Sequence, residues 1–378
     1  MKKTIVILAS RLVPRSFSVA GSFSVGWCVI ILTSVILLNL CNRCYSQDSH
    51  LSQYWMTPLL LNPSNAGAFT GEQRVYSNYK DQWRSIVNPY QTFDLTFDMG
   101  IYTEKLKKVL LGTGFSFIRD IAGDTKYGTT KASIMLASHV RINDKNTLSA
   151  GLQGGFSQQG YENSNLEWGS QYDGKVFNTN VSSGEEGRLY IVRYPDFSMG
   201  VRWGFSSKNV SMTSNDGIKA TAGLTMLHIN KPDQSFKISN DINKLFMRVI
   251  IHGKSSIGIK NTNMAVQPGG IVFLQGALKE ILLGLSIRYQ LREGSKYTEF
   301  VQGSAISFGA HYRLKDAAVV SSLIEFGKFA IGFSYDINIS KLTAISSGRG
   351  GFELSFRFIN PNPFHTKTSP KFIRQTLY

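Results

Sequence analysis

Cysteine is nearly absent from this chain, whose 378 residues contain three. Cys28, Cys41 and Cys44 all lie in a leader that we expect to be removed, so the mature chain would contain none. A chain without cysteine forms no disulfide and uses no thiol nucleophile. Disulfide-stabilised folds and thiol enzymes are therefore excluded for the mature protein.

Long apolar runs are also scarce. Beyond one run at about 23–40, no stretch reaches the ~20 apolar residues that a membrane-spanning helix needs. A mean hydropathy of -0.09 is too polar for a bundle of membrane helices, whereas 42% hydrophobic residues are too many for a disordered chain. The composition fits a membrane β-barrel, because half of its strand residues face lipid and half face a polar interior.

Patterns for metal, phosphate and catalytic sites are missing as well. The six histidines, at 50, 139, 228, 252, 311 and 365, have no metal-ligand spacing. Gly112-Thr113-Gly114 and Gly154-Gly155 fall inside expected strands with no helix after them, unlike phosphate-binding loops. We predict no enzyme activity, no cofactor and no metal. A membrane-embedded hydrolase stays an alternative, and its candidate pairs are His139 with Ser138 and His311 with Ser307.

Residues 1–46 have the pattern of a secretory signal peptide. Four basic residues precede the apolar run, and Cys44-Tyr45-Ser46 places small residues at the last and third-last positions before Gln47. We predict cleavage after Ser46 and export to the bacterial outer membrane. An uncleaved anchor helix is the alternative.

Acidic residues are outnumbered, and the net charge is +16. Five basic residues and no acidic ones lie in the leader, which leaves +11 for the mature chain. The basic residues are scattered and form no nucleic-acid motif, so we predict no nucleic-acid partner. Outer-membrane lipids with anionic head groups are the expected partner, and a solvated basic surface is the alternative.

A period of two dominates the rest of the sequence. In its clearest example, Phe93, Leu95 and Phe97 alternate with Asp94 and Thr96, which puts apolar and polar side chains on opposite faces of a strand. Three further strong copies span 197–206, 280–291 and 329–339. Each is about ten residues long, the length that a tilted strand needs to cross the hydrocarbon layer.

Ten weaker copies bring the total to about fourteen strands, with twelve and sixteen as alternatives. They lie at about 73–82, 108–119, 126–142, 146–159, 218–228, 243–259, 266–276, 303–314, 316–326 and 350–358. We therefore predict an all-β transmembrane antiparallel β-barrel over residues 73–358, because closure leaves no unpaired edge in lipid. A soluble β-sandwich would show the same alternation and is the alternative fold.

The flanking regions and one loop receive separate predictions. Residues 47–72 form an N-terminal segment that is a candidate plug, and 359–378 form a basic C-terminal tail. The connection at about 159–195 is too long for a simple turn, so it is the candidate partner loop, although a loop without a partner would look the same. Its candidate contact residues are Trp168, Tyr172, Glu185 and Glu186.

Two further expectations concern side chains of the barrel. Tyr79, Trp83, Tyr127, Tyr194, Tyr289 and Tyr312 lie near strand ends and are candidates for interfacial girdles. Asp94 and Asp98 point to the same side of one strand, and we expect Arg202, Arg288 or Arg313 to neutralise them across the interior.

Short sequence motifs at both ends of the barrel region resemble those of one family. Near the N-terminus these are Gln47-Asp48, Ser52-Gln53-Tyr54, Asn62-Pro63, Ala66-Gly67, Tyr79-Lys80-Asp81-Gln82-Trp83 and Tyr90-Gln91-Thr92. Near the C-terminus they are Arg313-Leu314-Lys315-Asp316-Ala317, the string from Gly332 to Leu342, and Gly351-Phe352-Glu353-Leu354-Ser355. In this order they resemble the PorP/SprF family of outer-membrane proteins linked to type IX secretion and gliding in Bacteroidetes.

The resemblance implies an outer-membrane barrel accessory to type IX secretion or gliding. It would bind a secreted surface protein with a type IX export signal, or periplasmic secretion components, and a passive pore or small-molecule channel is the alternative. We interpret the matched positions as scaffold rather than ligand contacts. They are Gln53, Tyr54, Asn62, Pro63, Ala66, Gly67, Trp83, Arg313, Asp316, Ser334, Tyr335, Asp336, Asn338, Ser340 and Glu353.

Overall fold

The computed structural model describes residues 48–360, apart from 70, 85–87, 102–108, 124, 163–166, 173, 179, 184–190, 208–216, 237–242, 293–302 and 342. Contacts divide the chain into two units, Met1–Ser46 and Gln47–Tyr378, and every described residue belongs to the second. Within the described part, no helix has the length and apolar character needed to cross a membrane.

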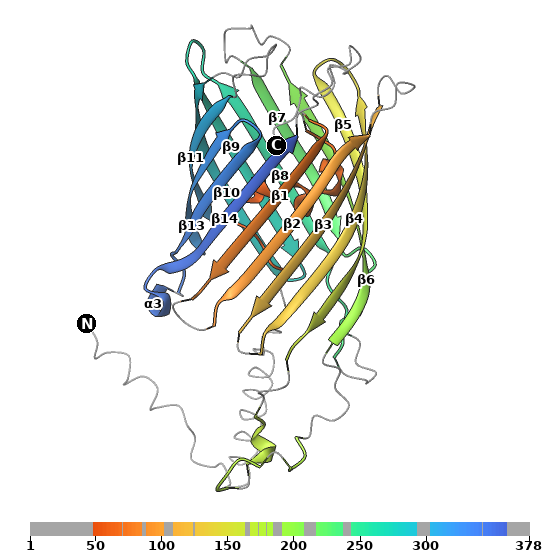
Figure 1. Cartoon of the computed structure of the whole chain (residues 1–378), viewed down its shortest axis with the longest axis vertical. Coiled ribbons are helices and arrows are strands. Elements are labelled where there is room, and N and C mark those ends of the chain that lie inside the picture. The colour runs from red at the N-terminus through yellow and green to blue at the C-terminus, as the bar shows by residue number, and fades with distance from the viewer. Residues whose placement is uncertain are drawn as a thin grey trace, which may run out of the picture. The chain divides into compact units, whose positions relative to one another are not determined.

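The described residues form fourteen strands that close into one antiparallel barrel (Figure 1). They are β1 (Gln73–Gln82), β2 (Tyr90–Ile101), β3 (Val109–Ala122), β4 (Tyr127–Arg141), β5 (Asn146–Gly160), β6 (Ile191–Ser206), β7 (Ile218–Leu227), β8 (Arg248–Gly258), β9 (Met264–Gln275), β10 (Leu278–Arg292), β11 (Ser304–Arg313), β12 (Ala317–Phe326), β13 (Phe329–Asn338) and β14 (Arg349–Asn360). β1 pairs with β14, from Gln73 opposite Asn360 to Gln82 opposite Gly351. This pairing satisfies backbone groups that hydrocarbon could not.

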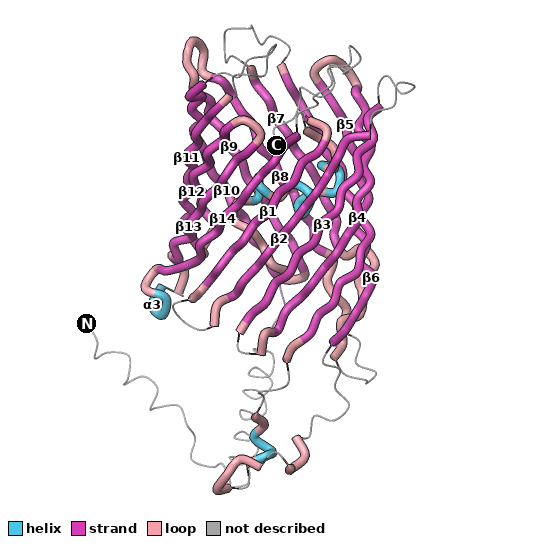
Figure 2. Tube along the Cα trace, viewed as in Figure 1, coloured by secondary structure: helices cyan, strands magenta, loops and turns pink. Residues whose placement is uncertain are grey.

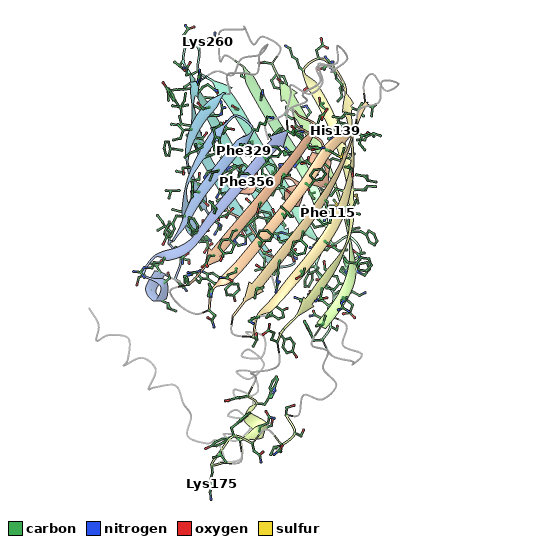
Figure 3. The ribbon with its side chains drawn as sticks, in the orientation of Figure 1. Phe115, His139, Lys175, Lys260, Phe329 and Phe356 are labelled. Atoms are coloured by element: carbon green, nitrogen blue, oxygen red, sulfur yellow. The ribbon has the colours of Figure 1, made fainter. Side chains whose placement is uncertain are left out.

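The two faces of the wall differ as a period of two predicts. Phe115, Phe329 and Phe356 project outward from β3, β13 and β14 (Figure 3), and each is more than a third exposed. On β2 the outward Phe93 alternates with Asp94, which is fully buried on the inner face. The outer wall is therefore suited to hydrocarbon, and the inner wall carries the polar chemistry.

The predicted transmembrane barrel and its count of fourteen strands are confirmed, and the main differences concern boundaries. β6 begins at Ile191, so Pro195 lies inside a strand rather than in the long loop. β7 pairs with β6 only from Met199 to Ser206, so no ladder hydrogen bond to β7 is lost at Pro195. Tyr194, expected in a girdle, is buried because its position in β6 faces inward.

The connections differ between the two ends of the barrel. One end carries the connections 161–190 and 228–247, and the short helix α3 (Thr343–Ser346) lies in another connection there. We call it the long-loop end. The other end carries the first residue of β1 and the last residue of β14, and we call it the terminus end.

Candidate functional site inside the barrel

Residues 48–69, which we call the inner segment, run through the interior of the barrel (Figure 2). The segment contains the helical turns η1 (Tyr54–Met56), α2 (Pro58–Leu61) and η2 (Pro63–Asn65). Its polar groups bond to Glu353 of β14, His252 of β8 and Asp98 of β2, which are strands on different sides of the wall. Strands therefore hold the segment from several directions.

The local sequence explains the tight turns of the segment. Pro58 and Pro63 open α2 and η2, where a missing N–H costs no hydrogen bond. The Asn62 side chain accepts a 2.9 Å hydrogen bond from the backbone N–H of Ser64 and so caps η2. The same amide donates to the carbonyl of Val201, at 2.9 Å, which ties the cap to β6.

Apolar packing attaches the segment to the wall. Met56 and Leu61 join a buried cluster with wall residues such as Ile250 and Ile271. Leu59 forms a second cluster with Met135 of β4. Fully burying a leucine or methionine side chain stabilises a structure by about 1.5–3 kcal/mol. These clusters therefore hold the segment even before its polar contacts are considered.

Glycines of three strands let the backbone of the segment touch the wall. A methyl group at Gly112 of β3 would overlap the carbonyl oxygen of Ala66. Methyl groups at Gly151 and Gly200 would overlap Ser64 and Asn62. Only glycine allows such an approach. The close approach of the inner segment is therefore the physical reason for glycine at these three positions.

Glu353 of β14 is the main polar anchor of the segment. Its two carboxylate oxygens accept hydrogen bonds from the backbone N–H groups of Ser52, at 2.7 Å, and Gln53, at 3.0 Å. The Gln53 side chain donates to the carbonyl of Glu353 at 3.1 Å. Glu353 is 1% exposed, so these bonds are shielded from water.

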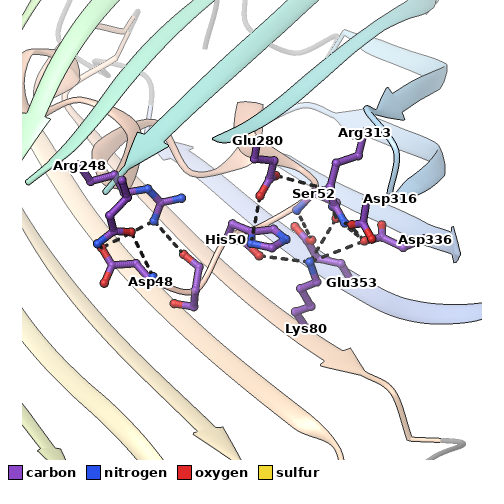
Figure 4. A network of polar contacts seen from close by, with 12 residues as sticks. Asp48, His50, Ser52, Lys80, Arg248, Glu280, Arg313, Asp316, Asp336 and Glu353 are labelled. Carbon is purple, nitrogen blue, oxygen red and sulfur yellow. Dashed lines mark hydrogen bonds and ion pairs between the residues drawn. The ribbon is translucent and has the colours of Figure 1, made fainter. Parts of the chain in front are cut away.

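A charged network continues from this anchor toward the long-loop end (Figure 4). Asp336 accepts a 2.8 Å hydrogen bond from the Ser52 hydroxyl and pairs with Arg313 at 3.0 Å. Arg313 also contacts Glu280 at 3.3 Å and Asp316 at 3.1 Å. Opposite charges thus surround the buried Arg313, which offsets its desolvation.

The start of the segment is held by a second set of charges. Asp48 lies 2.7 Å from His228 and 3.7 Å from Arg248. Burial raises the pKa of Asp48, but the attraction of His228 and Arg248 outweighs it and leaves the pKa well below its usual value. Burial lowers the pKa of His228, but Asp48 and Asp196 outweigh it and raise the pKa above 6.5. Asp48 belongs to the inner segment, and Asp196 of β6 lies 2.9 Å from the same ring, so His228 joins the segment to β6.

His50 behaves differently from His228. Burial, followed by the nearby charges of Lys80 and Arg313, holds the pKa of His50 well below 6.5. The ring is therefore neutral, and its 3.4 Å contact with Glu280 is a polar contact rather than an ion pair. The ammonium group of Lys80 donates a 3.1 Å hydrogen bond to the backbone carbonyl of His50.

The expected pairing of Asp94 and Asp98 across the interior is wrong. Asp98 pairs with Arg74 of the neighbouring strand β1, through bonds of 2.7 and 2.9 Å, and also accepts from the N–H of Gly67. Asp94 accepts a 3.1 Å hydrogen bond from Asn78, also on β1. The inner segment fills the space that an arginine would have to cross, so adjacent strands supply the partners.

The family-motif positions fall into three groups, and Tyr335 belongs to none of them. Gln53, Arg313, Asp316, Asp336 and Glu353 meet in the network just described, with Ser334 opposite Glu353 in the register. Tyr54, Asn62, Pro63, Ala66 and Gly67 belong to the inner segment. Trp83, Asn338 and Ser340 lie at connections of the long-loop end, and Tyr335 points outward.

The candidate partner loop is described only in part. Trp168 and Tyr172 flank a short turn, η3 (Gly169–Gln171), and Tyr172 is 57% exposed. Glu185 and Glu186 lie outside the described residues. The role predicted for this loop stays a prediction.

Several important residues escaped the sequence reasoning. Arg74, His228 and Arg248 all contact the inner segment. The available signal was a charged side chain at an inward position of a strand, as at Arg74 and Arg248. Such a residue shows which face of the strand is polar, but it does not show which residue it pairs with.

One of the two histidine and serine pairs, His139 with Ser138, does not form. His139 faces inward and Ser138 outward, because they are neighbours in β4. The partners of His139 are Ser149 of β5 and the Ala66 carbonyl, each at 2.8 Å. Since a carbonyl only accepts, Nε2 donates to it and Nδ1 accepts from Ser149. His139 is 1% exposed and serves to hold the inner segment. Among the described residues, no group of three or more His, Cys, Asp or Glu could hold a metal ion.

Comparison with known proteins identifies the family. The model of the family described as type IX secretion system membrane protein PorP/SprF matches residues 43–358. The chain belongs to the PorP/SprF family. It is therefore a type IX secretion-associated barrel of the outer membrane. No curated protein matches the chain significantly.

Solved structures give only distant likenesses to this PorP/SprF protein. The CymD monoaromatic hydrocarbon channel is 12% identical, with 82% of this chain and 94% of that chain covered and a TM-score of 0.39. BamA from Haemophilus ducreyi lacking POTRA domains 1–3 is 10% identical, with coverages of 77% and 70% and a TM-score of 0.38. A Pseudomonas aeruginosa FadL homologue is 10% identical, with coverages of 79% and 92% and a TM-score of 0.38.

Proposed function

We propose that this barrel is a non-enzymatic docking protein of the type IX system, which binds a secreted surface protein or a periplasmic secretion component. The observation that carries the proposal is the inner segment, which wall residues anchor from β2, β8 and β14. A lumen occupied in this way is better suited to a scaffold than to free diffusion. The matched motif residues in this network then act as scaffold, which agrees with their intramolecular bonds.

The long-loop end is the surface that we assign to the partner. In bacterial barrels the longer loops are extracellular, and the chain termini of an even-stranded barrel share the opposite side. By this rule, connections 161–190 and 228–247 face the exterior. Asp48 lies beside His228 at the same end, so cleavage after Ser46 would leave the mature N-terminus there. A secreted surface protein could then contact both the loops and the start of the inner segment.

Conductance separates this proposal from the passive pore. Purified full-length protein in planar bilayers should give almost no current at moderate voltage, because the inner segment occupies the lumen. Glu353→Ala, which removes the main anchor, should give flickering openings. Steady ohmic current through the wild-type protein would support the pore and contradict the scaffold.

Affinity capture tests the partner. Wild-type protein solubilised from outer membranes should retain one surface protein with a type IX export signal or one periplasmic secretion component, and shortening of 161–190 should release a surface partner. Shortening of 207–217 at the terminus end is the matched control. Deletion of the whole gene should remove that surface protein while most secretion continues. An unchanged set of surface proteins together with no co-purified partner would refute the proposal.

A further inference from the structure

Besides Arg74 and Arg202, which contact Asn65 of the inner segment, four basic side chains of the described strands line the lumen in the half of the barrel toward the terminus end. Lys219 of β7, Lys254 of β8, Arg288 of β10 and Arg357 of β14 occupy inward positions of their strands. Glu325 of β12 pairs with two of them, Arg288 and Arg357. We call this group the basic vestibule. Arg288, Glu325 and Arg357 retain 27%, 19% and 16% exposure of their side chains, so solvent reaches it.

The charges of the basic vestibule do not balance. Glu325 is shared by Arg288, at 2.6 Å, and Arg357, at 2.8 Å. Neither Lys219 nor Lys254 forms a hydrogen bond or ion pair with any other described residue, and Lys254 lies 5.9 Å from the Trp55 ring. One carboxylate therefore faces four cations. In a lumen of low dielectric, such an excess attracts an anion more strongly than on an open surface.

Buried hydroxyls stand beside these cations without partners of their own. Thr221 is 3% exposed and lies opposite Lys254 in the register of β7 and β8. Ser307 is 4% exposed and lies opposite Arg288 in the register of β10 and β11. Within the described part of the chain, neither hydroxyl finds a hydrogen-bond partner. A buried polar group normally has one, so these hydroxyls are available to a ligand.

The floor of the basic vestibule is aromatic. Trp55 of the inner segment stacks on His311 with ring centroids 4.5 Å apart. His311 is 6% exposed, and its Nδ1 has no hydrogen-bond partner among the described residues. A flat apolar floor below a set of cations and hydroxyl donors suits a small anion with an organic part as well as an inorganic one.

We propose that the basic vestibule is a binding site for an anionic group, a phosphate or a carboxylate, that enters the lumen from the terminus end. Lys254 with Thr221 and Arg288 with Ser307 form its two halves, and Lys219 adds charge at the entrance. The ammonium and guanidinium groups donate to the anion, because charge-assisted hydrogen bonds to phosphate and carboxylate are the strongest available. This site is separate from the anchoring network and does not depend on the docking role.

Calorimetric titration of the purified full-length protein tests the site. Inorganic phosphate and N-acetylglutamate are titrated separately at low ionic strength, so the two arms tell phosphate from carboxylate recognition. Saturable binding of at least one is expected, weakened by added salt. Lys254→Gln should weaken it about tenfold, the effect of losing one hydrogen bond to a charged group. Lys219→Gln, farther out, should give a smaller loss.

Matched controls make the result decisive. Lys328→Gln removes the same charge from an exposed turn between β12 and β13, and it should bind as the wild type does. Resistance of each variant to unfolding in SDS reports an intact barrel, and Lys219→Gln serves if Lys254→Gln does not fold. The proposal is overturned if neither anion binds at millimolar concentration, or if the lysine variants in the lumen bind like Lys328→Gln.

Discussion

Replacing Glu353 with alanine should loosen the inner segment around Ser52 and Gln53 while the barrel persists. The substitution removes two buried hydrogen bonds from backbone N–H groups to a carboxylate, at 2.7 and 3.0 Å. Hydrogen bonds to charged groups contribute about 1.5–3 kcal/mol each, so the segment should lose about 3–6 kcal/mol of local stability. Exchange of the amide hydrogens of Ser52 and Gln53 should accelerate by about two to four orders of magnitude, since 1.4 kcal/mol corresponds to tenfold. Mass spectrometry of peptides from 48–69 measures it.

Glu325→Ala is the matched control for this prediction. Glu325 is also a lumen carboxylate, but it accepts from Arg288 and Arg357 of the wall. Its loss should leave exchange in the inner segment unchanged. Equal exchange in Glu353→Ala and wild type would refute the anchoring argument. Equal acceleration in the segment and in the strands would mean that Glu353 stabilises the whole barrel instead.

Three further predictions concern packing, pH and lipid. Gly112→Val should lower the free energy of unfolding by about 1–3 kcal/mol in urea titrations, because the valine side chain would overlap the inner segment. Gly253→Ala should be tolerated, since its added methyl group would lie 3.5 Å from the nearest atom, the carbonyl oxygen of Thr221. The raised pKa of His228 stabilises the fold fully below pH 6.5, and this contribution should fade as pH rises through the folded pKa; His228→Gln should lack that dependence in amide exchange near Asp48. Phe115→Arg, in the middle of β3, should cost about 2–4 kcal/mol in lipid vesicles but little in a detergent that tolerates the charge.

Most of the fold follows from the local alternation of apolar and polar residues. Alternation such as Phe93, Asp94 and Leu95 depends only on which face of a strand each residue occupies, so it is readable without any partner strand. The same alternation puts Tyr335 and Asp336 on opposite faces of β13, and the structure shows that Asp336 is the one that points inward. Strand ends were less accurate, because β6 extends beyond its neighbour β7 and the sequence does not contain that offset.

The candidate site was only partly accessible to this reasoning. The short motifs shared with the family include Gln53 and Glu353, but neither motif shows that the two residues are in contact. They are 300 positions apart and meet because closure brings β14 beside β1 and around the inner segment. The wrong pairing of Asp98 has the same origin, since a strand pattern gives the face of a charge and not its place around the barrel.

The sequence alone therefore determined a membrane β-barrel of about fourteen strands and its family, because each follows from local alternation or from short motifs in a fixed order. The structure decided the strand number between twelve and sixteen. Tertiary structure alone decided that 48–69 lie inside, which buried charges pair, and which hydroxyls and lysines face one another in the lumen. The physical reason is that register and closure join residues far apart in the chain. Those contacts depend on the positions of all the strands together.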